Sequence, residues 1–169
     1  MKRLTAAIML ILIGAVIFAS NPISFSGRYA LVGSDGRTIR RTSVDVEGTG
    51  VVLATGEEKA KAEGSAFSLI LGENSLAAIK DEEGLVIYLV YGNATVVSGD
   101  ERDIAVYTPT TKTTLSAKGE YHFISLDKEE KAYNFSSPDI ELYDSIRGTY
   151  TTLSYNEGYD YIKGRKIEV

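Results

Sequence analysis

Residues 66–98 read AFSLILGENSLAAIKDEEGLVIYLVYGNATVVS, and this stretch decides the fold class. Apolar and β-branched runs at residues 66–71, 76–80, 85–90 and 94–98 alternate with short turn sequences. The turns are built from Gly, Asn, Asp and Glu, and Gly and Asn in particular tolerate tight backbone bends. Short runs with this punctuation predict consecutive β-strands rather than helices.

The same pattern continues on both sides of this stretch. From Arg28 onward no segment combines a 3.6-residue apolar period with helix caps. Residues 56–64 have good helix propensity but are bounded by Gly, and we expect a strand or turn there. We expect further strands at residues 28–32, 38–46, 51–55, 104–107, 112–117, 121–126, 131–135, 140–143, 149–153 and 159–162. The pattern predicts an all-β fold, namely a sandwich, roll or solenoid-like domain of many short strands after an N-terminal apolar helix.

Composition restricts the classes of function. The chain has 169 residues, which is room for one domain with its own core. It contains no Cys, and this excludes disulfides, thiolate catalysis and Cys-ligated metal sites. The formal net charge is -5 and no basic stripe is present in the sequence, so nucleic-acid binding is disfavoured.

The N-terminus has the pattern of an export signal. Lys2 and Arg3 precede residues 4–19, which are apolar apart from Thr5. This length lies between the apolar region of a signal peptide and a membrane-spanning helix. A cleaved signal peptide and a single membrane anchor therefore both remain open.

Small residues indicate where this leader would be cleaved. Ser24 and Ser26 fit the small-x-small rule for signal peptidase, with cleavage before Gly27. We therefore expect a leader at residues 1–26 and an extracytoplasmic β domain at residues 27–169, in the periplasm or at the cell surface.

From Gly64 to about residue 162 the order of signals resembles the periplasmic domain of the FecR family. The matching elements are Leu69 to Gly72 with Ser75, Leu89 to Gly92, Thr108 with Pro109, Gly119 before Tyr121 to Ile124, and two strand-and-glycine units at residues 140–148 and 153–158. One position departs from the pattern, because Glu120 follows Gly119 where the family usually has Thr.

The FecR resemblance implies a β fold and a non-enzymatic role as an interaction or scaffold module of a bacterial cell envelope. Full-length FecR regulators carry a cytoplasmic anti-sigma segment before the membrane helix. Only three residues precede the apolar stretch here, so we expect no direct contact with a sigma factor.

As an alternative, the chain resembles the membrane-anchored β-jellyroll proteins of lipid or lipopolysaccharide transport. It rests on the apolar leader and the strand-only body. Such a protein needs an open apolar groove, which Leu69, Leu71, Leu85, Ile87 and Leu89 would line. The competing expectation for these five residues is the sealed core of a sandwich.

The sequence contains no catalytic motif. His122 is the only histidine, and no G-x-S-x-G nucleophile elbow accompanies it. We expect it to be an exposed strand residue between buried aromatics. Carboxylates such as Glu73, Glu141 and Asp144 give no pair of distinct spacing, and no calcium or phosphate-binding loop is present. We therefore expect no enzyme activity, no metal and no cofactor.

Tyrosines are dense near the C-terminus. Tyr155, Tyr159 and Tyr161 are the candidate partner-binding residues, because tyrosines on one strand face offer rigid contact area with a polar tip. The alternative is that they form cross-strand pairs that hold the sheet together. The expected partner is an envelope protein or a glycan, with the membrane as a further contact if the leader is retained.

Overall fold

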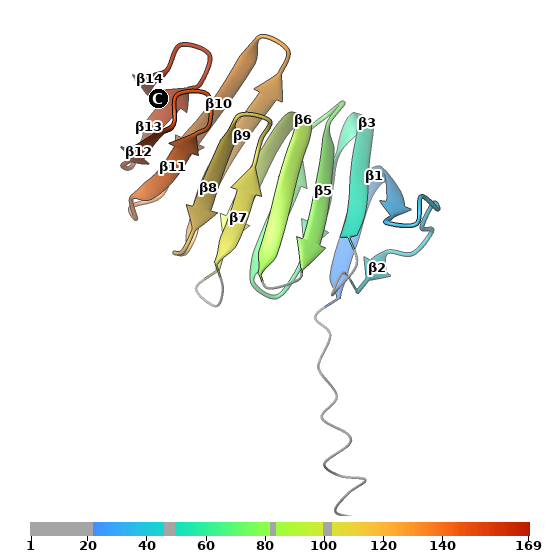
Figure 1. The fold of residues 1–169 in the computed structure, drawn as a ribbon. Helices are drawn as coiled ribbons and strands as arrows, with labels where there is room; N and C mark the ends of the chain where they lie inside the picture. The colour runs from blue at the N-terminus through green and yellow to red at the C-terminus, as the bar shows by residue number, and fades with distance from the viewer. Residues whose placement is uncertain (1–21, 46–49, 82–83, 100–102) are drawn as a thin grey trace, which may run out of the picture.

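The computed structural model describes residues 22–45, 50–81, 84–99 and 103–169, and every regular element among them is a strand. The strands are β1 (Ile23–Gly33), β2 (Ser43–Val44), β3 (Gly50–Glu63), β4 (Phe67–Leu71), β5 (Leu76–Asp81), β6 (Leu85–Ser98), β7 (Ile104–Tyr107), β8 (Thr111–Leu115), β9 (Gly119–Leu126), β10 (Glu129–Asn134), β11 (Ile140–Asp144), β12 (Thr149–Leu153), β13 (Glu157–Asp160) and β14 (Arg165–Glu168). The predicted all-β fold is confirmed (Figure 1). Within the described residues, no helix has the length and apolar character needed to cross a membrane.

Three long strands, β1, β3 and β6, fold the sheet into two layers. The first half of β6 pairs with β5 and β7, whereas its second half pairs with β4 and β9. β3 likewise pairs with β5 through its first half and with β4 through its second half. Each long strand therefore leaves one layer and enters the other.

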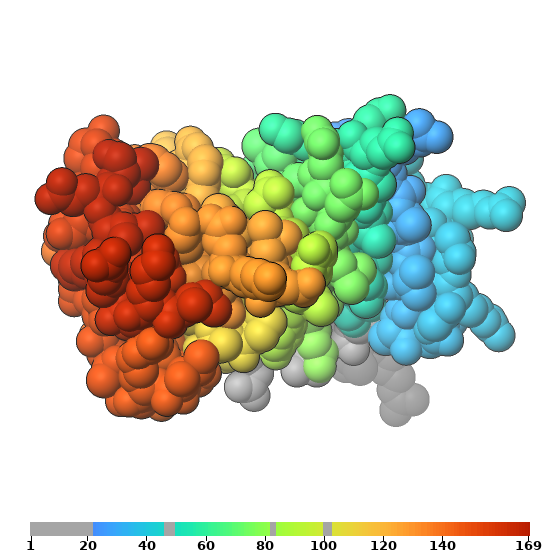
Figure 2. Space-filling model, turned by 90° about the horizontal axis from the view of Figure 1, so that it is seen from above, coloured from blue at the N-terminus to red at the C-terminus, as the bar shows by residue number. Residues whose placement is uncertain are grey.

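The first layer runs in the order β12, β11, β8, β7, first half of β6, β5, first half of β3 and second half of β1. The second layer runs β14, β13, β10, β9, second half of β6, β4, second half of β3, first half of β1 and β2. Among the strand pairs of the described residues, only β6–β7 is parallel. The hairpins β11–β12 and β13–β14 lie at one end of the molecule, and β1 and β2 lie at the other (Figures 1 and 2).

The core lies between the layers, because alternate residues of each strand point inward. In β6, Leu85, Ile87 and Leu89 are buried in the first layer, and Ala94 and Val96 are buried in the second. All of them belong to one hydrophobic cluster. The structure is thus a sandwich in which one core serves both layers.

The alternative of an open lipid groove does not agree with this packing. The five residues that would line the groove, Leu69, Leu71, Leu85, Ile87 and Leu89, are 0 to 3% exposed. They pack against the opposite layer as part of the closed core. The competing expectation, a sealed sandwich core, is therefore the correct one for these residues.

The bend in β6 lies at Gly92. Buried positions are odd-numbered before it and even-numbered after it, and Val90 and Tyr91 are both exposed. Gly92 has φ 99°, and a Cβ there would lie 2.0 Å from the hydroxyl oxygen of Ser75. Only glycine fits this conformation and this approach, so the crossing between layers depends on it.

Several sequence expectations about strands are corrected by the structure. Of the strand expected at residues 38–46, the described residues 38–45 form only the two-residue β2 and an isolated bridge at Thr38. Residues 85–90 and 94–98 belong to one bent strand instead of two. Residues 56–63, for which a strand or turn was expected, are part of β3. The strand β14 was not expected, because its charged residues hide the β pattern.

The boundary of the β domain also differs from the expected one. The apolar residues 4–19 lie outside the described part of the chain, but β1 already begins at Ile23. Ile23 and Phe25 are only 2% and 4% exposed, and Ser24 pairs with Glu63 of β3. Residues 23–26 therefore belong to β1, and among them the side chains of Ile23 and Phe25 are part of the core.

Candidate functional site

A row of tyrosines crosses the outer face of the first layer. Strand register places Tyr88 opposite Tyr107, Tyr107 opposite Lys112, Lys112 opposite Tyr143, and Tyr143 opposite Tyr150. These five residues, from β6, β7, β8, β11 and β12, are called the tyrosine row below. All five point away from the core, and Tyr88 and Tyr150 are 42% and 68% exposed.

The side chains of the tyrosine row contact one another. The rings of Tyr88 and Tyr107 stack with centroids 5.0 Å apart, and those of Tyr143 and Tyr150 lie 4.9 Å apart at 44°. The Lys112 ammonium lies 5.7 Å from the centre of the Tyr107 ring, within reach of a cation–π contact. The row therefore consists of two aromatic pairs, with the positive charge of Lys112 beside Tyr107 and on the strand between them.

The three tyrosines selected from the sequence lie elsewhere. Tyr159 and Tyr161 are 4% and 0% exposed, and their rings meet edge to face at 4.9 Å inside the core. A surface partner cannot reach these two residues in the folded domain, and their rings pack on each other two positions apart in the chain, not as a cross-strand pair. Tyr155 is 60% exposed, but it lies in the turn after β12, away from the row.

A hollow lies on the outer face of the second layer. It has a volume of about 600 Å³, and His122, Tyr133 and Phe135 lie along it together with the C-terminal residues 167–169. The His122 and Phe135 rings are 4.6 Å apart, and His122 also contacts the Glu120 carboxylate at 2.9 Å. As expected, His122 alternates with the buried residues Tyr121 and Phe123.

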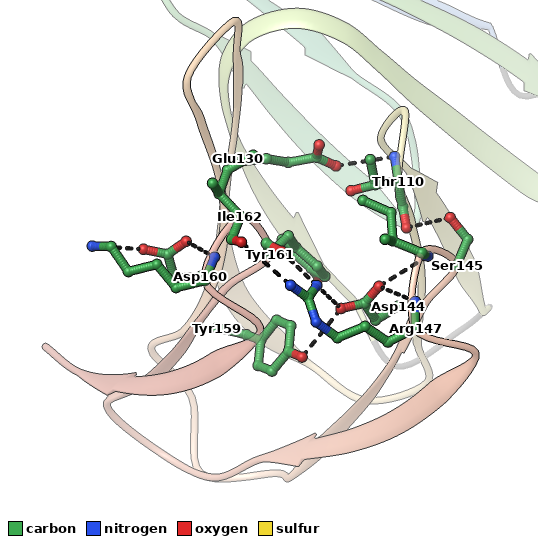
Figure 3. Close-up of polar contacts among 11 residues, drawn as sticks. Thr110, Glu130, Asp144, Ser145, Arg147, Tyr159, Asp160, Tyr161 and Ile162 are labelled. Atoms are coloured by element: carbon green, nitrogen blue, oxygen red, sulfur yellow. Dashed lines mark hydrogen bonds and ion pairs between the residues drawn. The ribbon is translucent and has the colours of Figure 1, made fainter.

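A buried polar cluster joins the turns of the two C-terminal hairpins (Figure 3). Asp144, with a fully buried side chain, accepts hydrogen bonds from Arg147 Nη1 at 2.8 Å and from the Tyr159 hydroxyl at 3.1 Å. Arg147 also donates to the backbone oxygens of Tyr161 and Ile162. The Asp144–Arg147 contact lies within the first hairpin, and the other contacts join it to β13 or to the turn after β13.

Burial and hydrogen bonding shift the pKa values of Asp144 and Tyr159 in opposite directions. Burial alone raises the pKa of Asp144, but hydrogen bonds from Arg147 and Tyr159 outweigh it and hold the pKa below its ordinary value. Burial, and then the hydrogen bond to Asp144, raise the pKa of Tyr159. Asp144 is thus ionised and Tyr159 neutral near pH 7, so neither is poised for proton transfer. Among the described residues, no group of His, Asp and Glu has the arrangement of a metal site.

The two turns belong to a repeat that sequence reasoning missed. Residues 141–148 and 157–164 share the pattern Glu-x-Tyr-Asp-x-Ile-(Arg/Lys)-Gly, with the second copy 16 positions after the first. Gly148 and Gly164 have φ 66° and 63°, and each donates a backbone hydrogen bond to the carbonyl of its repeat aspartate, Asp144 or Asp160. The two aspartates also form ion pairs with the basic residue three positions on.

Three of the residues that carried the FecR resemblance, Gly72, Ser75 and Gly92, lie at the crossing between layers. The Ser75 hydroxyl accepts a hydrogen bond from the Asn93 backbone beside Gly92. Thr55 Oγ1 donates to the Gly72 carbonyl and accepts from the Ser75 backbone at 2.9 Å. In this chain the Gly72 to Ser75 step therefore stabilises the bend.

No family model matches the chain, and no curated protein matches it in sequence. Its fold is similar to that of solved bacterial structures. Two crystal structures described as a "putative anti-sigma factor" from Parabacteroides distasonis superpose with TM-scores of 0.57 and 0.55, at 11% and 12% sequence identity. The superposition covers 69% and 70% of this chain, and the chain spans 57% and 58% of theirs. At the level of fold, this likeness agrees with the FecR resemblance.

Proposed function

We propose that this chain is a non-enzymatic interaction module of a bacterial cell envelope, and that it binds a protein partner through the tyrosine row. The observation that carries the proposal is the alignment of four outward tyrosines and one lysine across neighbouring strands. Tyrosine is enriched at protein interfaces because its ring provides large, rigid contact area and its hydroxyl a hydrogen bond. The anti-sigma description of the structural neighbours supports a regulatory setting for this role.

Ring orientation favours a protein over a glycan. The Tyr88 and Tyr107 rings stack on each other at 20°, so the ring faces between them are already covered. A sugar that stacks on an aromatic residue needs an open ring face. The row also offers hydroxyl groups and the Lys112 ammonium, which suit side chains and carboxylates of a protein surface.

The location of the module is part of the proposal. The basic residues Lys2 and Arg3 and the apolar residues 4–19 support export and placement of the β domain outside the cytoplasm. Because Ile23 and Phe25 belong to the core, a cut before Gly27 would remove part of β1. We infer that the leader is either retained as an anchor or cut ahead of Ile23.

Affinity capture of the exported full-length chain from its own envelope tests the proposal. The first variant is Lys112→Glu, which reverses the charge of the row. The matched control is Lys118→Glu, an exposed lysine in the turn after β8 that makes the same change in net charge.

The expected result is a protein captured by the native chain and by Lys118→Glu, with recovery at least ten-fold lower for Lys112→Glu. Equal recovery with both variants would place the contact elsewhere and overturn the tyrosine row as the binding surface. Recovery of lipid alone would overturn the interaction module and restore the lipid-transport alternative.

A further inference from the structure

The C-terminal end of the sandwich presents two edge strands of different character. β12 and β14 each follow a turn of the 16-residue repeat, and each pairs on one side only within the described residues. At equivalent repeat positions β12 has Thr149, Tyr150 and Thr152 where β14 has Arg165, Lys166 and Glu168. The repeat therefore provides an internal comparison between an uncharged edge and a charged one.

Natural proteins protect sheet edges from pairing with another chain, and the other sheet edges of this structure are protected in this way. β14 carries charges at three of its four positions, and β2 has only two residues. The outer side of β1 is covered by the segment that leads to β2, since Ile39 donates a backbone hydrogen bond to Leu31 and Phe25 donates to Thr42. β12, with the sequence TYTTL, has no charge, no proline and no glycine.

We propose that β12 pairs with β12 of a second copy of this chain, antiparallel and with Tyr150 opposite Tyr150 of the second copy. This two-fold register continues the tyrosine row without a break into the second copy, because the row follows directly opposed residues on every strand pair. It also gives the uncovered side of the Tyr150 ring a stacking partner. The inference concerns the edge of the layer, whereas the proposed function concerns its outer face.

A second copy fits this edge for reasons of charge. The chain as a whole has a net charge of -5, so most surfaces of two copies repel each other. β12 is neutral, and the neighbouring exposed side chains include Ile146, which is 62% exposed. A ladder of five residues covers less than the roughly 1,600 Å² of a standard interface, so the dimer is weak and forms in a concentration-dependent manner.

Disulfide trapping tests the proposal, and the absence of native Cys gives a clean background. Directly opposed residues of an antiparallel pair have Cα atoms about 4.5–5.5 Å apart, within the range that a disulfide spans. The full-length Tyr150→Cys chain is oxidised in the envelope with copper phenanthroline. Lys166→Cys, at the equivalent position of β14, is the matched control.

The expected result is a disulfide-linked homodimer with Tyr150→Cys and at least five-fold less with Lys166→Cys. Adding Thr152→Glu to Tyr150→Cys gives β12 the acidic residue that β14 has at that position, and we expect the dimer yield to fall about ten-fold. Sedimentation of the unmodified chain over a range of concentrations gives an independent reading, with a rising dimer fraction expected.

Equal trapping at both cysteines would indicate random collision and overturn the proposal. A disulfide from Tyr150→Cys to a different protein in place of the homodimer would also overturn it. An unmodified chain that stays monomeric up to about 1 mM would do the same. None of these results changes the Lys112→Glu comparison, so failure of the dimer and failure of the tyrosine-row contact are distinguishable.

Discussion

Asp144 and Asp160 occupy equivalent repeat positions but differ in what surrounds their ion pairs. Asp144 is fully buried and bonded by Arg147 and Tyr159, whereas Asp160 is paired with Lys163, which is 60% exposed. We expect Asp144→Asn to lower the free energy of unfolding by about 2–4 kcal/mol and Asp160→Asn by about 1 kcal/mol. Urea denaturation of both variants measures the difference. Equal losses would mean that the buried Asp144 cluster contributes no more to stability than the Asp160 ion pair.

The same two carboxyls predict how stability depends on pH. For both, burial alone raises the pKa but hydrogen bonds and the basic neighbour outweigh it, so the folded-state pKa lies below the ordinary value. A lowered folded-state pKa stabilises the protein above the unfolded pKa of about 3.9, and this stability is lost as pH falls through the folded pKa.

We therefore expect the free energy of unfolding to decrease below about pH 4. For Asp144→Asn the free energy of unfolding should decrease less steeply over that range, because the variant lacks one of the carboxyls with a lowered pKa. Denaturation curves at a series of acidic pH values check this. An identical slope for the native chain and the variant would contradict the role of Asp144.

At the residue scale, the sequence singled out tyrosines, but not those that form the tyrosine row. Tyr159 and Tyr161 share a strand face by period two, but which face is buried depends on the second layer. Tyr88, Tyr107 and Lys112 are far apart in sequence, and only the strand register aligns them. The repeat aspartates, by contrast, were readable from the sequence and were missed.

At the element scale, the bends of the long strands decide the architecture, and Gly92 is the clearest case. Gly92→Ala places a methyl group against Ser75 in a backbone conformation with φ 99°. We expect a loss of about 3 kcal/mol or more in the free energy of unfolding. Gly56→Ala in β3 is the control, because nothing lies within 4 Å of its added Cβ, and its effect should stay within about 1 kcal/mol. Chemical denaturation with similar values for both variants would show that the bend tolerates a side chain.

Most strands were predictable from the sequence because their inward and outward residues alternate. β7 and β12 have the predicted bounds. The bends were not predictable, because Gly92 with Asn93 has the composition of a turn while the backbone continues as a strand. β14 was missed because three of its four residues are charged, which hides the period-two signal.

At the scale of the whole molecule, the N-terminal part of β1 closes one end of the core. A chain that begins at Gly27 lacks the buried side chains of Ile23 and Phe25. We expect it to be less stable than a chain that begins at Pro22 by about 3–6 kcal/mol, the free energy of burying two large apolar side chains. Thermal unfolding of the two purified chains tests this. Equal melting temperatures would restore the leader boundary expected from the sequence.

The two-layer arrangement gives the molecule two outer faces with different character. The first layer carries the tyrosine row, and the second carries the hollow along His122 and Tyr133. The sequence predicts strands and a sandwich among several β architectures, but it does not predict which strands cross between layers. The two faces, and therefore the candidate site, follow only from that crossing.

Site-specific photo-crosslinking in the native envelope tests the central claim most directly. A photoreactive phenylalanine analogue replaces Tyr107 in the tyrosine row or, as the matched control, Tyr133 on the opposite face; both side chains are half-buried. The account predicts a discrete crosslinked protein partner from position 107 and none from position 133. A partner crosslinked from position 133 and absent from position 107 would contradict the tyrosine row as the binding surface.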